Sequence, residues 1–165
     1  METIWPYPEE EPAFEKSGAY TAWIAATDNK VHSGAAWRVQ VKGDEMATPV
    51  ERAKPSDGKS TSQRAILGAL VGALETLPPV STVDVYTNGQ YVTDLIDNFN
   101  EKRACGWESS DGPLANIDLL KRIEKVRTER QIEWSVHQVT KGKQPHSSII
   151  EHLRRLARSV CRDAS

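Results

Sequence analysis

Apolar and polar residues alternate along some parts of the chain and recur at helical spacing along others. Short runs rich in β-branched and aromatic residues, bounded by turn residues, predict strands. We expect strands at about 19–27, 34–42, 45–52, 82–87 and 131–138. Stretches with apolar residues on one side predict helices. We expect helices at about 61–77, from 90 onward, at 115–128 and at 148–162.

The order of these elements is three strands, a helix, a strand, two helices, a strand and a last helix. Strands joined by short turns form an antiparallel meander, and strands separated by helices join through crossover connections. The predicted fold is therefore α/β, with a mixed five-stranded sheet, a three-strand meander and flanking helices. A chain of 165 residues fits one such domain.

The first part of the chain has a different composition. Residues 1–18 hold five glutamates and three prolines, and their apolar residues show neither the alternation of a strand nor the spacing of a helix. Such a composition is typical of an extended segment that buries little apolar surface. We expect an acidic, proline-rich arm over 1–18, without core contacts of its own and ordered only by docking, followed by one domain over 19–165.

Charge is unevenly spread along the chain. Residues 1–100 hold 8 Lys or Arg against 14 Asp or Glu, and residues 101–165 hold 13 against 9. The second part could form a basic face along phosphates, or it could consist of ordinary solvated helices. The basic residues of the candidate face are Lys121, Arg122, Lys125, Arg127, Lys141, Lys143, Arg154, Arg155 and Arg158.

Several classes of protein are disfavoured by the sequence. Cys105 and Cys161 have no zinc spacing, and we expect them to be reduced thiols. The start of the chain does not resemble a signal peptide, and the longest apolar stretch, 65–74, is too short for a bilayer. We therefore expect a cytoplasmic protein without a membrane partner. Nucleotide-binding and nucleophile motifs such as GxGxxG and GxSxG are absent.

Four segments carry a resemblance to type 1 ribonuclease H, and they occur in that family's order. The residues 61–67 read TSQRAIL, 86–92 read YTNGQYV, 103–107 read RACGW and 115–120 read ANIDLL. They are similar to family segments that begin the first helix, end the fourth strand and flank a basic protrusion. The resemblance implies the ribonuclease H fold over about 19–160.

Members of that family hydrolyse the RNA strand of an RNA/DNA hybrid with two Mg²⁺ ions held by four carboxylates. Hard cations of this kind need anionic oxygen ligands. The resemblance places the four positions at Ala22, which follows Thr21, and at Ile66, Asn88 and Glu151, with Arg154 replacing Glu151 if the alignment shifts. It therefore implies a degenerate member with no intact catalytic set, no metal site and no cofactor. Mg²⁺ would be needed only if the chain were an active hydrolase.

Other acidic residues could in principle replace the lost carboxylates. Asp28 lies near the end of the first predicted strand. Asp84 shares a strand face with Tyr86 and Asn88, yet it lies about 13 Å from Asn88 along an extended chain. Glu151 has a structural explanation, because Ser148 and Glu151 have the spacing of a capping box. His146, in the loop before the last helix, is expected to be solvated.

Contacts to nucleic acid could persist without cleavage. By resemblance, Thr61, Ser62 and Gln63 would touch the backbone of a hybrid, and Gln90 would lie near the RNA 2′-hydroxyls. These residues could equally serve as ordinary helix caps. Further candidate contacts come from a stacking ring and from cations, namely Trp107, Lys141, Lys143 and Arg154.

The sequence leads to one main hypothesis and two alternatives. The main hypothesis is a ribonuclease H-like protein that binds RNA/DNA hybrid, structured RNA or DNA without cutting it, within a nucleoprotein complex. The first alternative is a protein-interaction scaffold that docks partners through the acidic arm or the arginine-rich last helix. The second is an active metal-dependent ribonuclease with rearranged ligands.

Overall fold

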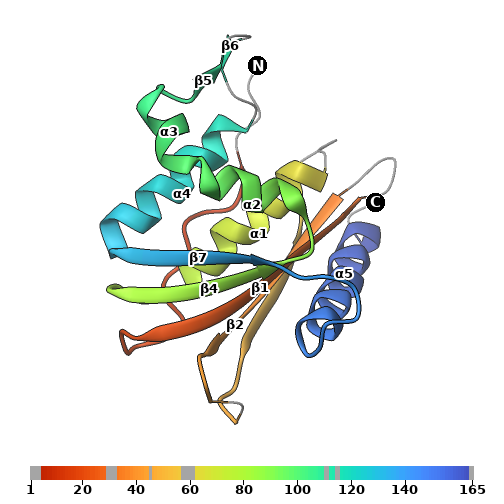
Figure 1. Ribbon diagram of the computed structural model, residues 1–165. Helices are drawn as coiled ribbons and strands as arrows, with labels where there is room; N and C mark the ends of the chain where they lie inside the picture. Colours follow the sequence, from red (N-terminus) through yellow and green to blue (C-terminus); the bar gives the residue numbers. More distant parts are fainter. Residues whose placement is uncertain are drawn as a thin grey trace.

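The computed structural model describes residues 5–28, 33–44, 46–56, 62–109, 112–113 and 116–163. Figure 1 shows how its strands and helices are arranged. In chain order the elements are β1 (Ala19–Asp28), β2 (Ser33–Val41), β3 (Val50–Pro55), α1 (Ser62–Thr76), β4 (Ser81–Thr87), α2 (Gln90–Asp97), α3 (Phe99–Ala104), β5 (Glu108–Ser109), β6 (Gly112–Pro113), α4 (Ile117–Arg130), β7 (Ile132–Gln138) and α5 (His146–Asp163).

Five strands form the central sheet in the order β3-β2-β1-β4-β7. The pairs β1–β2 and β2–β3 are antiparallel, whereas β1–β4 and β4–β7 are parallel. The predicted mixed five-stranded sheet with a three-strand meander is thereby confirmed. The weakest predicted strand is displaced: β3 covers 50–55, where it pairs with β2 from Val39↔Val50 to Gly34↔Pro55.

Helices lie on both faces of the sheet, and α5 packs mainly against β1, β2 and β3. Figure 1 shows α1, α2 and α4 on one face and α5 alone on the other. Along β1, Tyr20, Ala22 and Ile24 join the core cluster under α1, while Trp23 and Ala25 join the cluster under α5. Across the described ranges, none of the helices has both the length and the apolar character needed to cross a bilayer.

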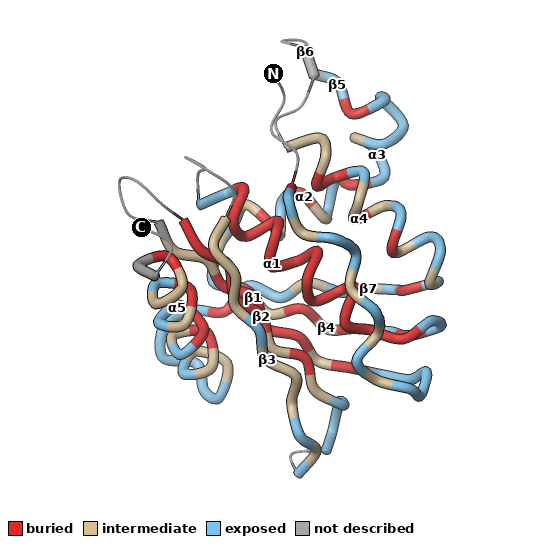
Figure 2. The backbone as a smooth tube through the Cα atoms, turned by 180° about the vertical axis from the view of Figure 1, so that it is seen from behind, coloured by how far each residue is buried: buried red, intermediate tan, exposed pale blue. Residues whose placement is uncertain are grey.

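Helix α1 lies at the centre of the fold. All of its residues from Arg64 to Thr76 are buried, which appears in Figure 2 as an almost continuous red helix. Two glycines make room for large rings: a Cβ at Gly68 would lie 2.2 Å from the Trp5 ring, and one at Gly72 would lie 2.5 Å from the Trp37 ring. A helix that is apolar around its whole circumference requires packing partners on every side.

One of those partners is the N-terminal arm. Trp5 is only 7% exposed and belongs to the main core cluster, and Tyr7 and Phe14 pack against the same cluster. The expectation of an arm without core contacts is therefore wrong. Its aromatic residues bury enough apolar surface to hold an extended segment against the domain. A domain boundary at residue 18 stays a prediction.

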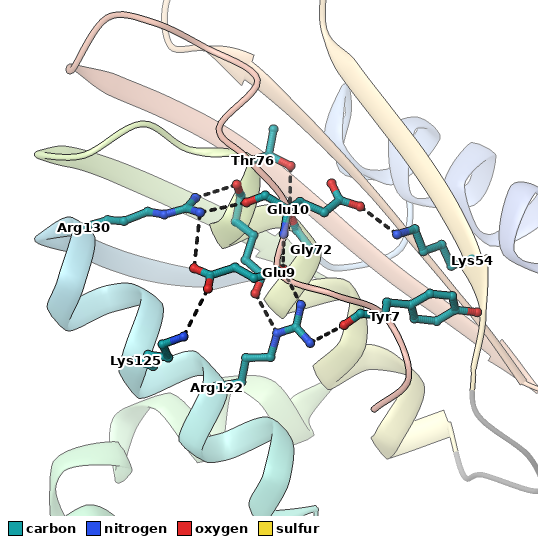
Figure 3. A network of polar contacts seen from close by, with 10 residues as sticks. Tyr7, Glu9, Glu10, Lys54, Gly72, Thr76, Arg122, Lys125 and Arg130 are labelled. Carbon is teal, nitrogen blue, oxygen red and sulfur yellow. Dashed lines mark hydrogen bonds and ion pairs between the residues drawn. The ribbon is translucent and has the colours of Figure 1, made fainter. Parts of the chain in front are cut away.

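Charged groups fasten the arm to α1, α4 and β3, as Figure 3 shows. Glu9 forms ion pairs with Lys125 and Arg130, and Glu10 forms one with Lys54. Beneath them Arg122 of α4 donates to both carboxylate oxygens of Glu75, at 2.7 and 2.8 Å, and to the carbonyl oxygen of Tyr7. The acidic residues of the arm thus neutralise cations of its own domain.

Candidate functional site

A cleft opens at the sheet edge where the parallel neighbours β1 and β4 end. Open α/β sheets commonly bind ligands at the carboxyl ends of their strands. This cleft has a volume of about 480 Å³ and lies between those strand ends, the starts of α1 and α2, and α5. Its side chains include the apolar Ile66 and Val92, the polar Ser62, Gln63 and Asn88, and the basic Arg154 and Arg158.

Two of the positions that the resemblance assigns to carboxylates, and the alternative fourth position, line the cleft together. Ile66 of α1 is 8% exposed, Asn88 follows the last residue of β4, and Arg154 projects from α5. Arg154 is the fourth position only in the shifted alignment; Glu151, the fourth position of the unshifted one, lies in an adjoining pocket that also includes Asn88, so the choice between them stays a prediction. An apolar side chain, a neutral amide and a guanidinium share the place where the family resemblance implies anionic ligands.

Ala22 is not part of this cleft. It is fully buried and pairs with Val85 of β4, three residues before Asn88. The placement of the first carboxylate position at Ala22 is therefore wrong. The β1 residues that do line the cleft are Ala26 and Thr27.

The strand register points to a different residue for the first position. Thr27 is followed by Asp28, the last residue of β1, which repeats the Thr-then-carboxylate pattern of the family. The side chain of Asp28 lies outside the described residues. The Thr27-Asp28 dipeptide was the sequence signal for this position, but it could be chosen over Thr21-Ala22 only once the cleft was located at the end of β1.

Glu151 lies beside the cleft, in a side pocket that it lines together with Lys141 and Ser147. The side pocket and the cleft share Asn88 and Arg154. The capping-box explanation of Glu151 is wrong, because α5 begins at His146 and Ser148 already lies inside the helix. Ser148 donates instead to the side chain of Gln144. Glu151 is within 3.4 Å of Arg154, and both side chains are close to half exposed.

The lining of the cleft does not fit a pair of magnesium ions. Within the described ranges, no cluster of three His, Cys, Asp or Glu could hold a metal. The cleft itself presents two guanidinium groups, which repel a cation, and an amide oxygen at Asn88, which carries no charge. The same lining suits an anion.

Some of the candidate nucleic-acid contacts line the cleft or its side pocket, and others lie outside both. Ser62 and Gln63 are exposed on the lip of the cleft, and Lys141 lines the side pocket. Gln90, at the start of α2, is exposed and donates to Asp94, while Lys143 is exposed in the loop before α5. Thr61 lies outside the described residues.

Trp107 does not belong to this surface. It is 4% exposed and packs edge-on against Phe99 in the main core cluster. A ring buried in this way has no free face on which a base could stack. The expected stacking role of Trp107 is therefore not supported by the structure.

The basic face is smaller than the sequence suggests. On α4, Arg122 pairs with Glu75, Lys125 pairs with Glu9, and the Arg127 guanidinium lies 3.8 Å from the centre of the Trp134 ring. These cations are committed to contacts within the domain. The cations that remain beside the cleft come from α5 and the loop before it.

Asp84 has partners on the opposite side of β4 from the main core. Its carboxylate lies 2.6 Å from the Lys42 ammonium and 3.1 Å from His137. The hydrogen bond from Lys42 lowers the pKa of Asp84, and the bond to His137 lowers it further. Asp84 is absent from the lining of the cleft, so we assign it a structural role.

His146 is an ordered part of the α5 face. Its ring stacks on Tyr86 with the ring centroids 3.8 Å apart, and its Nδ1 accepts a hydrogen bond of 3.0 Å from Trp23. The expectation of a solvated His146 is therefore wrong. Burial lowers the pKa of His146, and the neighbouring His137 and Lys143 lower it further.

We expect the protein to lose stability on mild acidification through His146. The folded state favours the neutral imidazole, so this contribution is complete above the ordinary His pKa of about 6.5 and is lost as the pH falls through the lowered pKa of the folded state. Urea unfolding at about pH 7.5 and about pH 5.5 measures the loss. His146→Phe should flatten this pH dependence, whereas His152→Gln, an exposed histidine on the same helix, should retain it. An unchanged dependence in His146→Phe would contradict the assignment.

Comparisons with known proteins agree with this architecture. The family model described as RNase H matches residues 22–145. A ribonuclease H of Rhodopseudomonas palustris (strain HaA2) is 37% identical over 84 residues, covering 49% of this chain and 52% of the relative. The chain thus spans about half the length of the curated relatives it matches.

Two solved structures show the same fold at low sequence identity. A foamy viral protease-reverse transcriptase in complex with RNA/DNA hybrid has a TM-score of 0.70 and 19% identity, covering 99% of this chain and 22% of that one. RNase H1 from Halobacterium salinarum NRC-1 has a TM-score of 0.56 and 16% identity, covering 86% of this chain and 98% of that one. The family-model match ends before α5, so the placement of Arg154 depends on the tertiary structure.

Proposed function

Because the chain belongs to the ribonuclease H family, we propose that it binds nucleic acid through its cleft and does not cleave the bound strand. The main support is the lining of the cleft, where Ile66 and Asn88 occupy two of the family positions and Arg154 lies in the same cleft. None of the three can act as an anionic ligand. A metal-assisted hydrolase needs such ligands to hold the ions that activate water and stabilise the leaving oxygen.

Binding would use groups that contact the backbone of a strand. Near one side of the cleft, the starts of α1 and α2 carry exposed polar residues, namely Ser62, Gln63 and Gln90. Arg154 lines the other side, and Lys141 lines the adjoining side pocket. Hydroxyl, amide and guanidinium groups of this type contact phosphates and sugars without reading base sequence. We propose RNA/DNA hybrid, structured RNA or DNA as the ligand, bound within a nucleoprotein complex.

The scaffold alternative loses one of its two docking segments. The arm is occupied by its own domain, because Trp5 is buried and Glu9 and Glu10 are paired. A protein partner would therefore have to use the arginine-rich helix α5, where Arg155 is exposed.

One observation favours an active hydrolase as the second candidate. Asp28 follows Thr27 at the cleft end of β1, so a carboxylate is available in sequence for the first family position. The relatives compared are also called ribonuclease H. A hydrolase of this kind would have to work with fewer or different ligands, since Ile66 contributes none and Asn88 carries no charge, and its further carboxylate would be Glu151 in the side pocket.

A gel assay with a labelled RNA/DNA hybrid separates binding from cleavage. We expect a shifted band that weakens steeply with added salt, as phosphate contacts require. We expect no cleavage with Mg²⁺ or Mn²⁺. Asp28→Asn serves as the matched variant: metal-dependent cleavage in the wild type that is lost in Asp28→Asn would establish the hydrolase instead. A hybrid that is neither shifted nor cut would favour the protein scaffold.

A further inference from the structure

We propose that Arg154 and Arg158 bind a backbone phosphodiester of a nucleic-acid strand directly, in the place where the family resemblance implies metal ions. This inference rests on the proposed function and deepens it. A guanidinium group carries a fixed positive charge and presents several N–H donors, which allows it to contact two phosphate oxygens at once. The hydrogen bonds of two guanidinium groups to phosphate oxygens would take the place of the contacts that a metal pair makes with those oxygens.

The placement of the two arginines supports an anion between them and the sheet edge. They are four residues apart on α5, so their side chains leave the same face of the helix, and both line the cleft. Two like charges at this spacing repel each other and destabilise a helix. A bound anion removes that cost.

Counter-charges for the pair are scarce within the described part of the chain. Arg154 has a contact of 3.4 Å with Glu151, which lines the side pocket and not the cleft. Arg158 is exposed and has no ion pair among the described residues. By contrast, Arg122 and Arg130 on α4 both pair with carboxylates. The α5 pair therefore retains positive charge that α4 does not.

The opposite wall of the cleft adds neutral donors. Asn88 lies there, and Ser62 and Gln63 occupy the lip. Helix α2 starts at the same wall, and its N-cap residue Gly89 makes no side-chain capping bond. The first turn of α2, with the positive end of its dipole, lies at the cleft, since Gly89, Tyr91 and Val92 belong to its lining. A phosphate in the cleft would have donors on two sides.

The test compares two charge-matched double variants. Arg154→Gln with Arg158→Gln removes the pair from the cleft, while Arg155→Gln with Lys121→Gln removes two exposed cations that do not line it. Binding of a fluorescent RNA/DNA hybrid is measured by anisotropy in EDTA and again in Mg²⁺, over a range of salt concentrations. Circular dichroism and urea unfolding check that each variant is folded.

We expect the wild type to bind hybrid in EDTA as tightly as in Mg²⁺. The cleft variant should bind about tenfold more weakly or worse, and its salt dependence should fall by about one unit for each lost phosphate contact. The control variant should lose less than about threefold, because its charges act only at long range. If the cleft double variant does not fold, the exposed Arg158→Gln change alone provides the comparison.

The outcomes separate this site from the proposed function. Hybrid binding that is equal in the two double variants, or that requires Mg²⁺, overturns the arginine site and leaves nucleic-acid binding intact. If the wild type binds neither hybrid nor structured RNA nor DNA, the proposed function fails. In that case a thermal-shift titration with inorganic pyrophosphate in EDTA shows whether the arginines bind a free phosphate. Whether or not pyrophosphate stabilises the protein, a strand phosphodiester is then ruled out as the ligand.

Discussion

Replacing Trp5 with alanine should destabilise the protein by about 3–5 kcal/mol, the usual cost of removing a buried large aromatic side chain. The ring fills the space above Gly68 and is 7% exposed. Its backbone N–H also donates to Asp118 at 2.9 Å, which anchors the arm to the start of α4. Urea unfolding followed by circular dichroism measures the change in the free energy of unfolding.

The matched control for this change is Met46→Ala. Met46 is 92% exposed, so its truncation should change stability by no more than about 0.5 kcal/mol. Equal midpoints for Trp5→Ala and Met46→Ala would mean that the arm is not docked in solution. A large loss for Trp5→Ala alone would show that the arm is part of the core.

Replacing Glu75 with alanine should cost about 3 kcal/mol, because it leaves a partly buried guanidinium without its counter-ion. The side chain of Glu75 is 2% exposed, and Arg122, with a side chain 20% exposed, donates to both of its carboxylate oxygens. The backbone N–H of Glu10 donates to the same carboxylate at 3.3 Å. The loss therefore affects the attachment of the arm as well as α1 and α4.

Glu129→Ala provides the comparison for Glu75, since Glu129 is an exposed glutamate on α4. We expect it to change the free energy of unfolding by less than about 0.5 kcal/mol. Limited proteolysis gives a second measurement: the arm should be cut faster in Glu75→Ala than in the control. A Glu75→Ala protein as stable as Glu129→Ala would show that the Arg122 ion pair contributes no net stability.

The docked arm also changes which cations are available to a ligand. Arg122, Lys125 and Arg130 are neutralised by Glu9 and Glu75. The basic surface beside the cleft consequently depends on α5 and its preceding loop. A sequence with little net charge can therefore still present a local positive site, because the glutamates of its acidic arm pair with cations of α4 and β3.

Parts of the candidate site were predictable from local sequence alone. Asn88 could be placed because it follows a short apolar strand and precedes a helix, and Ile66 could be placed because it lies in the first turns of a long apolar helix. The last position could not be fixed in this way. Glu151 and Arg154 lie on the same helix, and only the packing of α5 against the sheet shows that Arg154 lines the cleft.

By itself the sequence determined the order of the five sheet strands and of α1, α2, α4 and α5, and it placed Ile66 and Asn88 at two candidate positions, but it did not predict α3, β5 or β6. Periodicity and turn residues act over a few neighbours, and they are legible without the rest of the chain. Only the tertiary structure decided that Ala22 is core, that Trp107 is buried, that the arm is docked and that Arg154 and Arg158 both line the cleft. These facts depend on strand register and on contacts between distant segments, which local patterns do not specify.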